Sequence, residues 1–136
     1  MKVTEKAGMN ESEEQGEETY FFDTYAIFEV ILGNEKYAPY KDVNAMTTVF
    51  NIAELNYNLK KEKSKDISDK TSEKYFGSVV EVTLDDIKEA MDLKIKNKDL
   101  SIPDVIGYTV AKRYGVKFLT GDEGFKNFDN VEFVKK

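Results

Sequence analysis

The chain has 136 residues, a formal net charge of -6, and neither cysteine nor histidine. A chain of this length forms one domain with a continuous core. The missing residue types exclude disulfide frameworks, thiolate and histidine zinc sites, and any catalysis built on imidazole. Oxygen ligands remain for metal chemistry, and these are the ligands that magnesium and manganese prefer.

The first eighteen residues differ in composition from the rest of the chain. Residues 1–18 hold six glutamates against two lysines and almost nothing apolar, which predicts a disordered acidic tail before a domain over residues 19–136. No apolar run approaches the length of a membrane span, and no targeting signal begins the chain. We therefore expect a soluble, cytoplasmic protein that does not bind a membrane.

The first part of the domain alternates strand and helix. Residues 20–24 predict a short buried strand, and residues 25–32 predict a helix that Gly33 closes as a left-handed cap. Residues 46–49 predict an extended segment. A helix follows over residues 49–61, with an apolar stripe along one side.

The middle of the chain is more polar. One or two short helices are expected up to Phe76, followed by a strand over residues 79–82. Thr83 then caps another helix. The expected buried stripe of that helix consists of four apolar residues, Leu84, Ile87, Met91 and Ile95.

The last third begins with Ser101, which caps a helix that has Pro103 in its first turn and ends at Gly115. Residues 117–120 and 131–134 predict the final two strands. Strands separated by helices predict an α/β fold, a three-layer sandwich with a central, mostly parallel sheet and helices on both faces.

Four acidic residues fall where an apolar strand or helix meets a loop, namely Asp23, Glu54, Asp104 and Asp122. Ligands of open α/β sheets bind at the carboxyl ends of the strands, where these side chains are expected to converge. Two negative charges about 4 Å apart repel by roughly 4 kcal/mol at an effective dielectric of about 20. Four carboxylates in one cleft therefore indicate a bound divalent cation.

Each acid also has a purely local explanation. Asp104 completes an S-x-x-D capping box, and Asp23 can cap the helix after the first strand. Glu54 can pair with a polar neighbour on a solvated helix face. Asp122 can be a turn residue in TGDEG. The order of all four in one α/β pattern favours the metal site.

Three motifs surround these acids in order, FDTYAI, NIAEL and PDVIGYTVAKRYGVKFLTGDEGF. Over about residues 19–136 they resemble the PIN-domain nucleases, metal-dependent ribonucleases that include the VapC-like toxins of prokaryotic toxin–antitoxin pairs. The resemblance implies that the four acids are the catalytic and metal-binding residues for Mg²⁺ or Mn²⁺. It also implies supporting roles for Thr24, Asn51 and Thr120.

The activity implied by the resemblance is endonucleolytic hydrolysis of RNA phosphodiester bonds. Without histidine, the attacking water must be activated by metal and carboxylates, which predicts a 5'-phosphate product. An antitoxin protein is the implied partner and a homodimer the implied assembly. Two positions depart from the family pattern. Gly124 replaces a further Asp of many members, and Val105 replaces a small residue and is expected to narrow the cleft.

Basic residues suggest where RNA would bind. Lys60 and Lys61 begin a lysine-rich stretch, and Lys112 and Arg113 lie on the helix that carries Asp104. Such residues supply salt-sensitive contacts to phosphate. The alternative for the lysine-rich stretch is a solvated helix pair balanced by neighbouring acids.

Two other functions compete with the nuclease. A magnesium-dependent phospho-acceptor domain has a similar sheet, but it needs a lysine after a late strand, and Lys117 here precedes its strand. A PIN scaffold that binds RNA or protein without cutting stays open because of Gly124.

Overall fold

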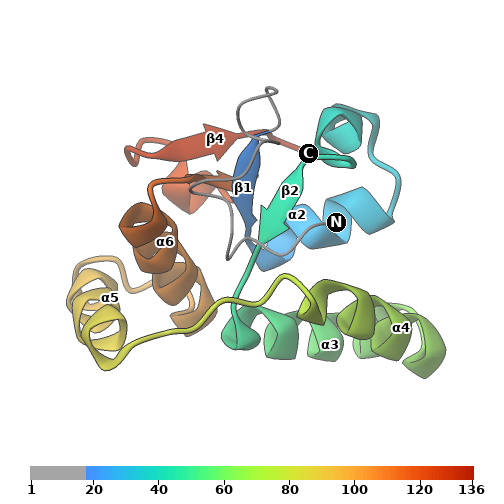
Figure 1. The fold of residues 1–136 in the computed structure, drawn as a ribbon, viewed down its shortest axis with the longest axis horizontal. Helices are drawn as coiled ribbons and strands as arrows, with labels where there is room; N and C mark the ends of the chain where they lie inside the picture. Colours follow the sequence, from blue (N-terminus) through green and yellow to red (C-terminus); the bar gives the residue numbers. More distant parts are fainter. Residues whose placement is uncertain (1–17) are drawn as a thin grey trace.

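A computed structural model of the chain describes residues 18–136 (Figure 1). The predicted disorder of the acidic tail concerns residues that lie, except for Glu18, outside the described part of the chain. The centre is a four-stranded sheet in the order β2-β1-β3-β4, and all three pairings are parallel. Its strands are β1 (Thr19–Phe22), β2 (Asn44–Met46), β3 (Lys117–Thr120) and β4 (Val131–Phe133).

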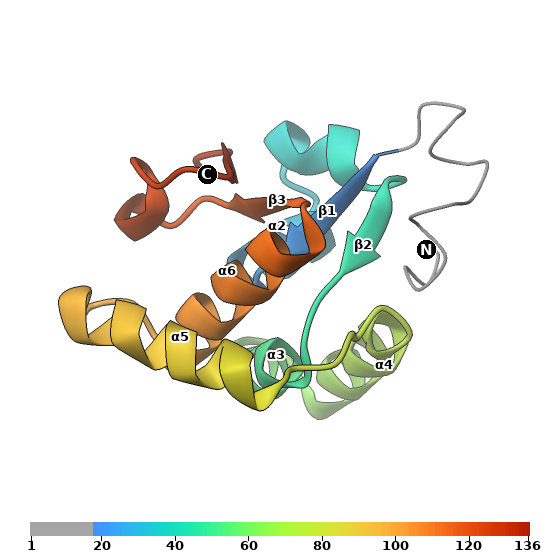
Figure 2. The same ribbon diagram turned by 60° about the vertical axis from the view of Figure 1, so that its left-hand side comes forward.

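Helices flank this sheet on both sides, so the predicted α/β fold is confirmed. They are α2 (Thr24–Ile31), α3 (Val49–Glu62), α4 (Lys65–Phe76), α5 (Leu84–Lys96) and α6 (Ile102–Tyr114), with short 3-10 helices η2 (Glu35–Tyr40) and η3 (Glu123–Phe125). Figures 1 and 2 show that α5 lies against α6 and that α4 lies against α3. None of the helices within residues 18–136 is both long and apolar enough to cross a bilayer.

The core has two layers because successive strand residues point to opposite faces of the sheet. Tyr20 and Phe22 of β1 pack with Leu119 of β3 against the buried faces of α2, η2 and α3. Phe21 and Phe118 point the other way and pack against α5 and α6. The central strands β1 and β3 are therefore buried on both faces.

Local signals predicted most element ends correctly. Asp23 caps α2 by accepting a hydrogen bond from the Ala26 N–H at 2.7 Å. Ser101 begins α6 through a capping box, and Gly115 ends it with φ at 71°. Gly33, with φ at 79°, follows α2 as expected. The extended segment predicted at 46–49 is displaced toward the N-terminus, because Thr48 already caps α3.

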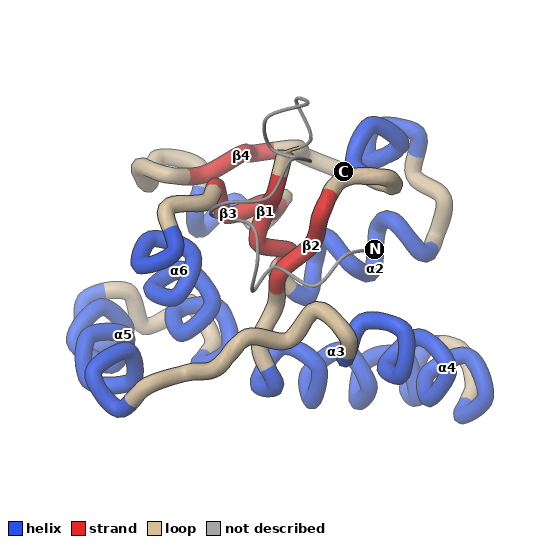
Figure 3. Tube along the Cα trace, in the orientation of Figure 1, coloured by secondary structure: helices blue, strands red, loops and turns tan. Residues whose placement is uncertain are grey.

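The strand predicted over residues 79–82 is wrong. Only an isolated bridge between Thr47 and Val79 forms there, and Figure 3 shows a loop between α4 and α5. A fifth strand would need β2 as its partner, but β2 ends at Met46 and the chain then turns into α3. Val80 and Val82 pack against the core from this loop instead.

The stripe predicted for α5 is also wrong at both ends. Leu84 is 66% exposed and Ile95 is 72% exposed, whereas Asp86 and Ala90 are buried. The face turned toward α6 is set by Asp86, which binds Arg113 of that helix. A single helix, α4, occupies the polar stretch before this region.

Candidate active site

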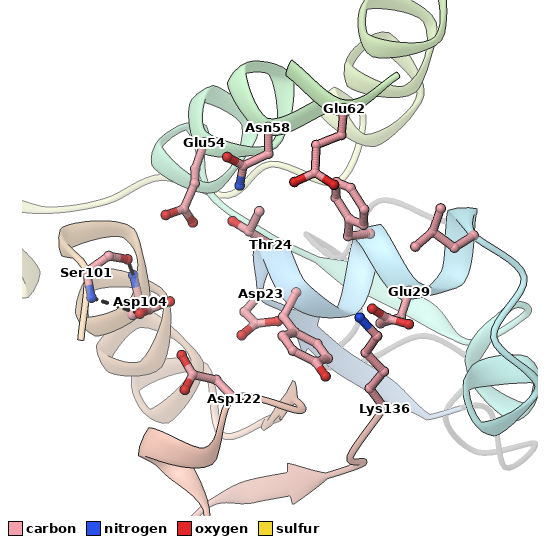
Figure 4. Close-up of a pocket in the computed structure, with 13 residues that line it drawn as sticks. Asp23, Thr24, Glu29, Glu54, Asn58, Glu62, Ser101, Asp104, Asp122 and Lys136 are labelled. Carbon is pink, nitrogen blue, oxygen red and sulfur yellow. Dashed lines mark hydrogen bonds between the residues drawn. The ribbon is translucent and has the colours of Figure 1, made fainter. Parts of the chain in front are cut away.

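A pocket of about 400 Å³ opens at the carboxyl edge of β1 and β3 (Figure 4). All four predicted acids line it, from four separate segments of the chain, namely Asp23, Glu54, Asp104 and Asp122. Parallel pairing explains part of this convergence. The Asp23 N–H donates to the Leu119 carbonyl at 3.3 Å, so the residues that follow β1 and β3 emerge side by side.

Asp23 is the most buried of the four acids, with 1% of its surface exposed. Burial raises the pKa of Asp23 well above its ordinary value. Hydrogen bonds from the Thr120 hydroxyl and the Ala26 N–H act in the opposite direction, and the charges of Asp104 and Asp122 raise the pKa further. Hydrogen bonds therefore fix the position of the Asp23 carboxylate, but they do not offset the cost of burying its negative charge.

Asp104 serves as a helix cap and lines the pocket at the same time. Its Oδ2 accepts the Ser101 N–H at 2.8 Å, and Ser101 Oγ accepts the Asp104 N–H at 3.1 Å. The capping-box explanation is thus correct. Burial raises the pKa of Asp104 to about 6, and the nearby charges of Glu54 and Asp122 add to the rise.

Asp122 and Glu54 line the pocket and are less buried than Asp23. Asp122 Oδ1 accepts the Gly124 N–H at 2.9 Å, so its explanation as a turn residue also holds. Glu54 projects from α3 into the pocket (Figure 4). Within residues 18–136, Glu54 has no hydrogen-bond or ion-pair partner, so the structure does not support the alternative of a paired surface residue.

The charge of the pocket is almost uncompensated. Six carboxylates and a single lysine are among its lining residues: Asp23, Glu29, Glu54, Glu62, Asp104, Asp122 and Lys136. No group of three acidic side chains in the described chain is close enough, as it stands, to hold a metal ion. The pocket is thus an acidic cleft whose carboxylates converge, rather than a preformed coordination sphere.

The profile of the PIN domain matches residues 20–131 of this sequence. The chain belongs to the PIN-domain family. Comparison with curated proteins found no match.

Solved structures with this fold share little sequence with the chain. A toxin–antitoxin complex from Klebsiella pneumoniae superposes with a TM-score of 0.67 at 15% identity, over 86% of this chain and 98% of that chain. PAE2754 from Pyrobaculum aerophilum gives 0.65 at 18% identity, over 86% and 91%. VapBC2 from Rickettsia felis, bound to a promoter DNA fragment, gives 0.63 at 15%, over 85% and 96%. At such identities the likeness shows the fold alone.

The three predicted supporting residues surround the acids of this PIN domain in different ways. Thr24 lines the pocket, and its hydroxyl donates to the Asn51 carbonyl at 3.4 Å. Asn51 is fully buried behind it, where its Oδ1 accepts the Thr48 hydroxyl at 2.7 Å. Thr120 bonds the Asp23 carboxylate and also accepts the Asp122 N–H at 3.0 Å. Thr120 therefore ties two of the acids together.

The four predicted RNA-binding residues lie outside the pocket. Lys60 pairs with Asp69 at 3.3 Å, and the Lys61 ammonium lies 4.8 Å from the centre of the Tyr57 ring. These contacts fit the alternative of a balanced, solvated helix pair. RNA contact by Lys60 or Lys61 stays a prediction.

The basic pair on α6 lies at the end of the helix opposite to the pocket. Lys112 is roughly 12 Å along the axis from Asp104, at about 1.5 Å per residue. Lys112 pairs with Asp129 at 3.2 Å, and Arg113 binds Asp86. A role for either in RNA binding likewise stays a prediction.

The two departures from the family pattern have different consequences. Val105 is fully buried in the core and does not line the pocket, so the expected narrowing is wrong. A Cβ at Gly124 would lie 2.7 Å from Leu100 Cδ2 and 3.3 Å from Asp122 Oδ1. A further Asp at this position would require Leu100 to move. Phe125 is fully buried, as expected of a core residue.

The sequence analysis missed three charged residues of the pocket. Glu62 lies two turns after Glu54 on α3, with Asn58 between them on the same face, so helical spacing signalled its position. Glu29 is 6% exposed and accepts a hydrogen bond from Asn34 at 2.9 Å. No local pattern signals Lys136, which reaches the pocket only through the path of the last strand.

Proposed function

We propose that this PIN domain is a metal-dependent endoribonuclease. The observation that carries the proposal is that Asp23, Glu54, Asp104 and Asp122 line one pocket without a cation paired to any of them among the described residues. PIN domains are generally nucleases, which supports the reaction class.

The residues fit a hard divalent cation. The donors are all carboxylate oxygens, which Mg²⁺ and Mn²⁺ prefer. Burial and mutual repulsion raise the pKa of Asp23 and Asp104, and a cation held by these residues would offset both effects by favouring their charged forms. Because no three acidic side chains of the described residues are close enough as they stand, we propose that the side chain of Glu54, which no hydrogen bond holds, moves toward the other acids when metal binds.

Each acid has a distinct part in the proposed reaction. Asp23, Asp104 and Asp122 are oriented by hydrogen bonds from backbone N–H groups of their own caps, which holds them at the pocket wall. Glu54 has no such bond and can accept the proton of the attacking water. When bound, the divalent cation stabilises the charge on the phosphate and lowers the pKa of that water.

The reaction is hydrolysis. Water adds to phosphorus, the bond between phosphorus and the 3'-oxygen breaks, and the products carry a 5'-phosphate and a 3'-hydroxyl. A 2',3'-cyclic phosphate product contradicts the proposal, because it requires attack by the neighbouring 2'-hydroxyl.

The biological setting is proposed from the fold neighbours. Two of them are described as a toxin–antitoxin complex and as VapBC2 bound to promoter DNA. We infer a toxin of this kind, acting in the cytoplasm as a homodimer with an antitoxin protein as its partner. If a gene for a small DNA-binding protein lies beside the gene for this chain, that setting is supported; if none does, the toxin assignment loses its main support.

The decisive experiment is a metal titration followed by thermal melting and by RNA cleavage. Saturating Mg²⁺ or Mn²⁺ stabilises the wild type by RT ln(1 + [L]/Kd), about 2.7 kcal/mol at a hundredfold excess over Kd. Asp104→Asn abolishes this stabilisation and lowers cleavage by more than the roughly 100-fold that loss of an outer-shell partner costs. Asp92→Asn, an exposed acid on α5 outside this pocket, is the matched control and behaves as wild type.

Two results would count against the enzyme. A wild type that gains no stability from either ion has no metal site. A wild type that binds metal and RNA but leaves the RNA intact is the non-catalytic scaffold, which Gly124 and the loose arrangement of the acids favour.

A further inference from the structure

Lys136 is the only cationic side chain among the described residues that line the acidic pocket. In Figure 4 it enters from the side opposite Glu54, and its ammonium points toward Glu29 and the pocket interior. No carboxylate of the described chain lies within ion-pair distance of its Nζ. The ammonium is therefore available to a ligand.

The segment that carries Lys136 is held in place on both sides. The Val134 N–H donates to the Thr120 carbonyl at 2.9 Å, and the Tyr37 hydroxyl donates to the Val134 carbonyl at 2.6 Å. The next side chain, Lys135, pairs with Glu123 outside the pocket. These bonds direct consecutive side chains to opposite sides, so that Lys136 turns inward.

The backbone of Lys136 has its own contacts. Its N–H bonds the Tyr25 hydroxyl, and its carbonyl accepts the Lys36 ammonium at 3.5 Å. Gly121 makes this close approach feasible, since a Cβ there would lie 2.4 Å from the Tyr25 ring and 2.5 Å from the Val134 carbonyl oxygen. The position of the Lys136 side chain thus follows from the packing of the last strand against the turn that carries Asp122.

An RNA strand that enters this pocket meets carboxylates on nearly every side. A bound metal ion would compensate for the charge of the phosphate under attack, but Glu29 and Glu62, which line the same pocket, would repel the neighbouring phosphates. Lys60, Lys61, Lys112 and Arg113 lie outside the pocket and are engaged by other groups. Among the residues that the structure describes, Lys136 alone can contact such a phosphate from within the pocket, and lysine is a suitable point charge for it.

We propose that Lys136 is a positioning residue whose ammonium binds the backbone phosphate next to the scissile one. This inference rests on the proposed function, since it requires RNA in the pocket. It also predicts the path of the RNA across the pocket, from the four acids toward α2 and the segment after β4.

The test compares Lys136→Met, Lys136→Arg and Lys117→Met. Lys117 is an exposed control at the opposite end of β3. Binding of a fluorescein-labelled single-stranded RNA is followed by anisotropy over a range of salt, with Ca²⁺ replacing Mg²⁺ and RNA integrity checked on a gel. Lys136→Met weakens binding roughly fivefold. It also lowers the slope of log K against log salt by about 0.7, the value for one lost phosphate contact with a single strand.

In cleavage assays with Mg²⁺, Lys136→Met raises KM and leaves kcat nearly unchanged, while Lys136→Arg and Lys117→Met resemble wild type. An unchanged salt slope in Lys136→Met, or an equal loss in Lys117→Met, overturns this inference while leaving the nuclease intact. A wild type that neither gains stability from metal nor cleaves RNA overturns the proposed function itself. Thermal melting in Mg²⁺ separates the cases, because Lys136→Met retains the full stabilisation.

Discussion

A buried or partly buried acid lies near each end of helix α6, and the surroundings of the two acids differ: Asp104 belongs to α6 itself, whereas Asp86 belongs to α5. At the N-terminal end, burial raises the pKa of Asp104, and no cationic side chain of residues 18–136 is paired with it. At the C-terminal end, Arg113 binds the buried Asp86 with two hydrogen bonds of 2.8 Å. Burial alone would raise the pKa of Asp86, but the hydrogen bonds from Arg113 and Thr83 and the charge of Arg113 together outweigh burial and leave that pKa below its ordinary value.

This difference distinguishes buried acids that contribute to the fold from buried acids that are expected at a functional site. A buried acid that contributes to the fold has its partner in the chain, as Asp86 does on α5. Buried acids that lack a partner destabilise the protein unless a ligand compensates for them, and they accumulate at functional sites. The same helix therefore has a charge-compensated end at Arg113 and an uncompensated acidic end at Asp104, where we propose that a cation binds.

Removing the ion pair between Arg113 and Asp86 has the largest expected effect on stability. Arg113→Met leaves the Asp86 carboxylate buried and unpaired, so we expect the free energy of unfolding to fall by about 2–3 kcal/mol. Urea melts measure this loss. Mg²⁺ should still stabilise the variant by the wild-type amount, because the pocket lies at the far end of α6. Loss of the metal response would mean that the two ends are coupled.

The second largest effect on stability is expected at Gly121, where the segment after β4 packs closely against the turn that carries Asp122. A methyl group at Gly121 would clash with the Tyr25 ring and the Val134 carbonyl. We expect Gly121→Ala to destabilise the protein by about 1–3 kcal/mol and to raise KM for RNA by displacing Lys136. Gly115→Ala is an informative contrast, since nothing lies within 4 Å of a Cβ there and only its φ of 71° is strained. A normal KM in Gly121→Ala contradicts this view of the strand.

The raised pKa of Asp104 predicts that the stability of the metal-free protein depends on pH. Asp104 has a folded pKa of about 6 against an ordinary 3.8, so the folded state retains a proton that the unfolded chain releases. The free energy of unfolding of the metal-free protein therefore falls as pH rises from about 4 to 6. Above that range Asp104 is ionised in both states, so no further loss occurs. Asp104→Asn keeps an acceptor for the cap and removes the charge. We expect it to gain about 1–2 kcal/mol at neutral pH and nothing near pH 4.

Thermal melts from acidic to neutral pH without metal, with Asp92→Asn as the control, measure this gain. A less stable Asp104→Asn protein at neutral pH would show that the cap outweighs the repulsion in the pocket.

The smallest effect is expected on the outer face of α5. Leu84 is 66% exposed, so Leu84→Ser should change stability by less than about 0.5 kcal/mol. A chemical denaturation curve is sufficient to measure it. A larger loss would indicate that apolar packing, and not the bond between Asp86 and Arg113, orients this helix.

Much of the fold could be predicted because its signals are local. The helix caps at Asp23, Thr83 and Ser101 and the glycines after α2 and α6 act through hydrogen bonds and dihedral angles within a few residues. The strand predicted at 79–82 failed because a strand depends on a partner. Local composition does not reveal that β2 ends too early to supply one.

The candidate site likewise combines features that the sequence predicts with features that only the fold produces. The order of four acids at element ends is a property of the sequence, and it led to the pocket because parallel strands bring their carboxyl ends to one edge. Their pKa values depend on burial and on mutual distance, which arise only when distant segments meet. The same is true of Lys136, whose entry into the pocket depends on how the last strand packs against β3.

The sequence by itself determined the element ends, the alternation of strand and helix, and the all-oxygen donor set, since each depends on residue type and short spacing. Only the tertiary structure decided which acids are compensated and which are not. The buried face of α5, the partner of Asp86 and the acidic surroundings of Lys136 all come from contacts between segments far apart in the chain. The energy of a charge depends on its neighbours in space.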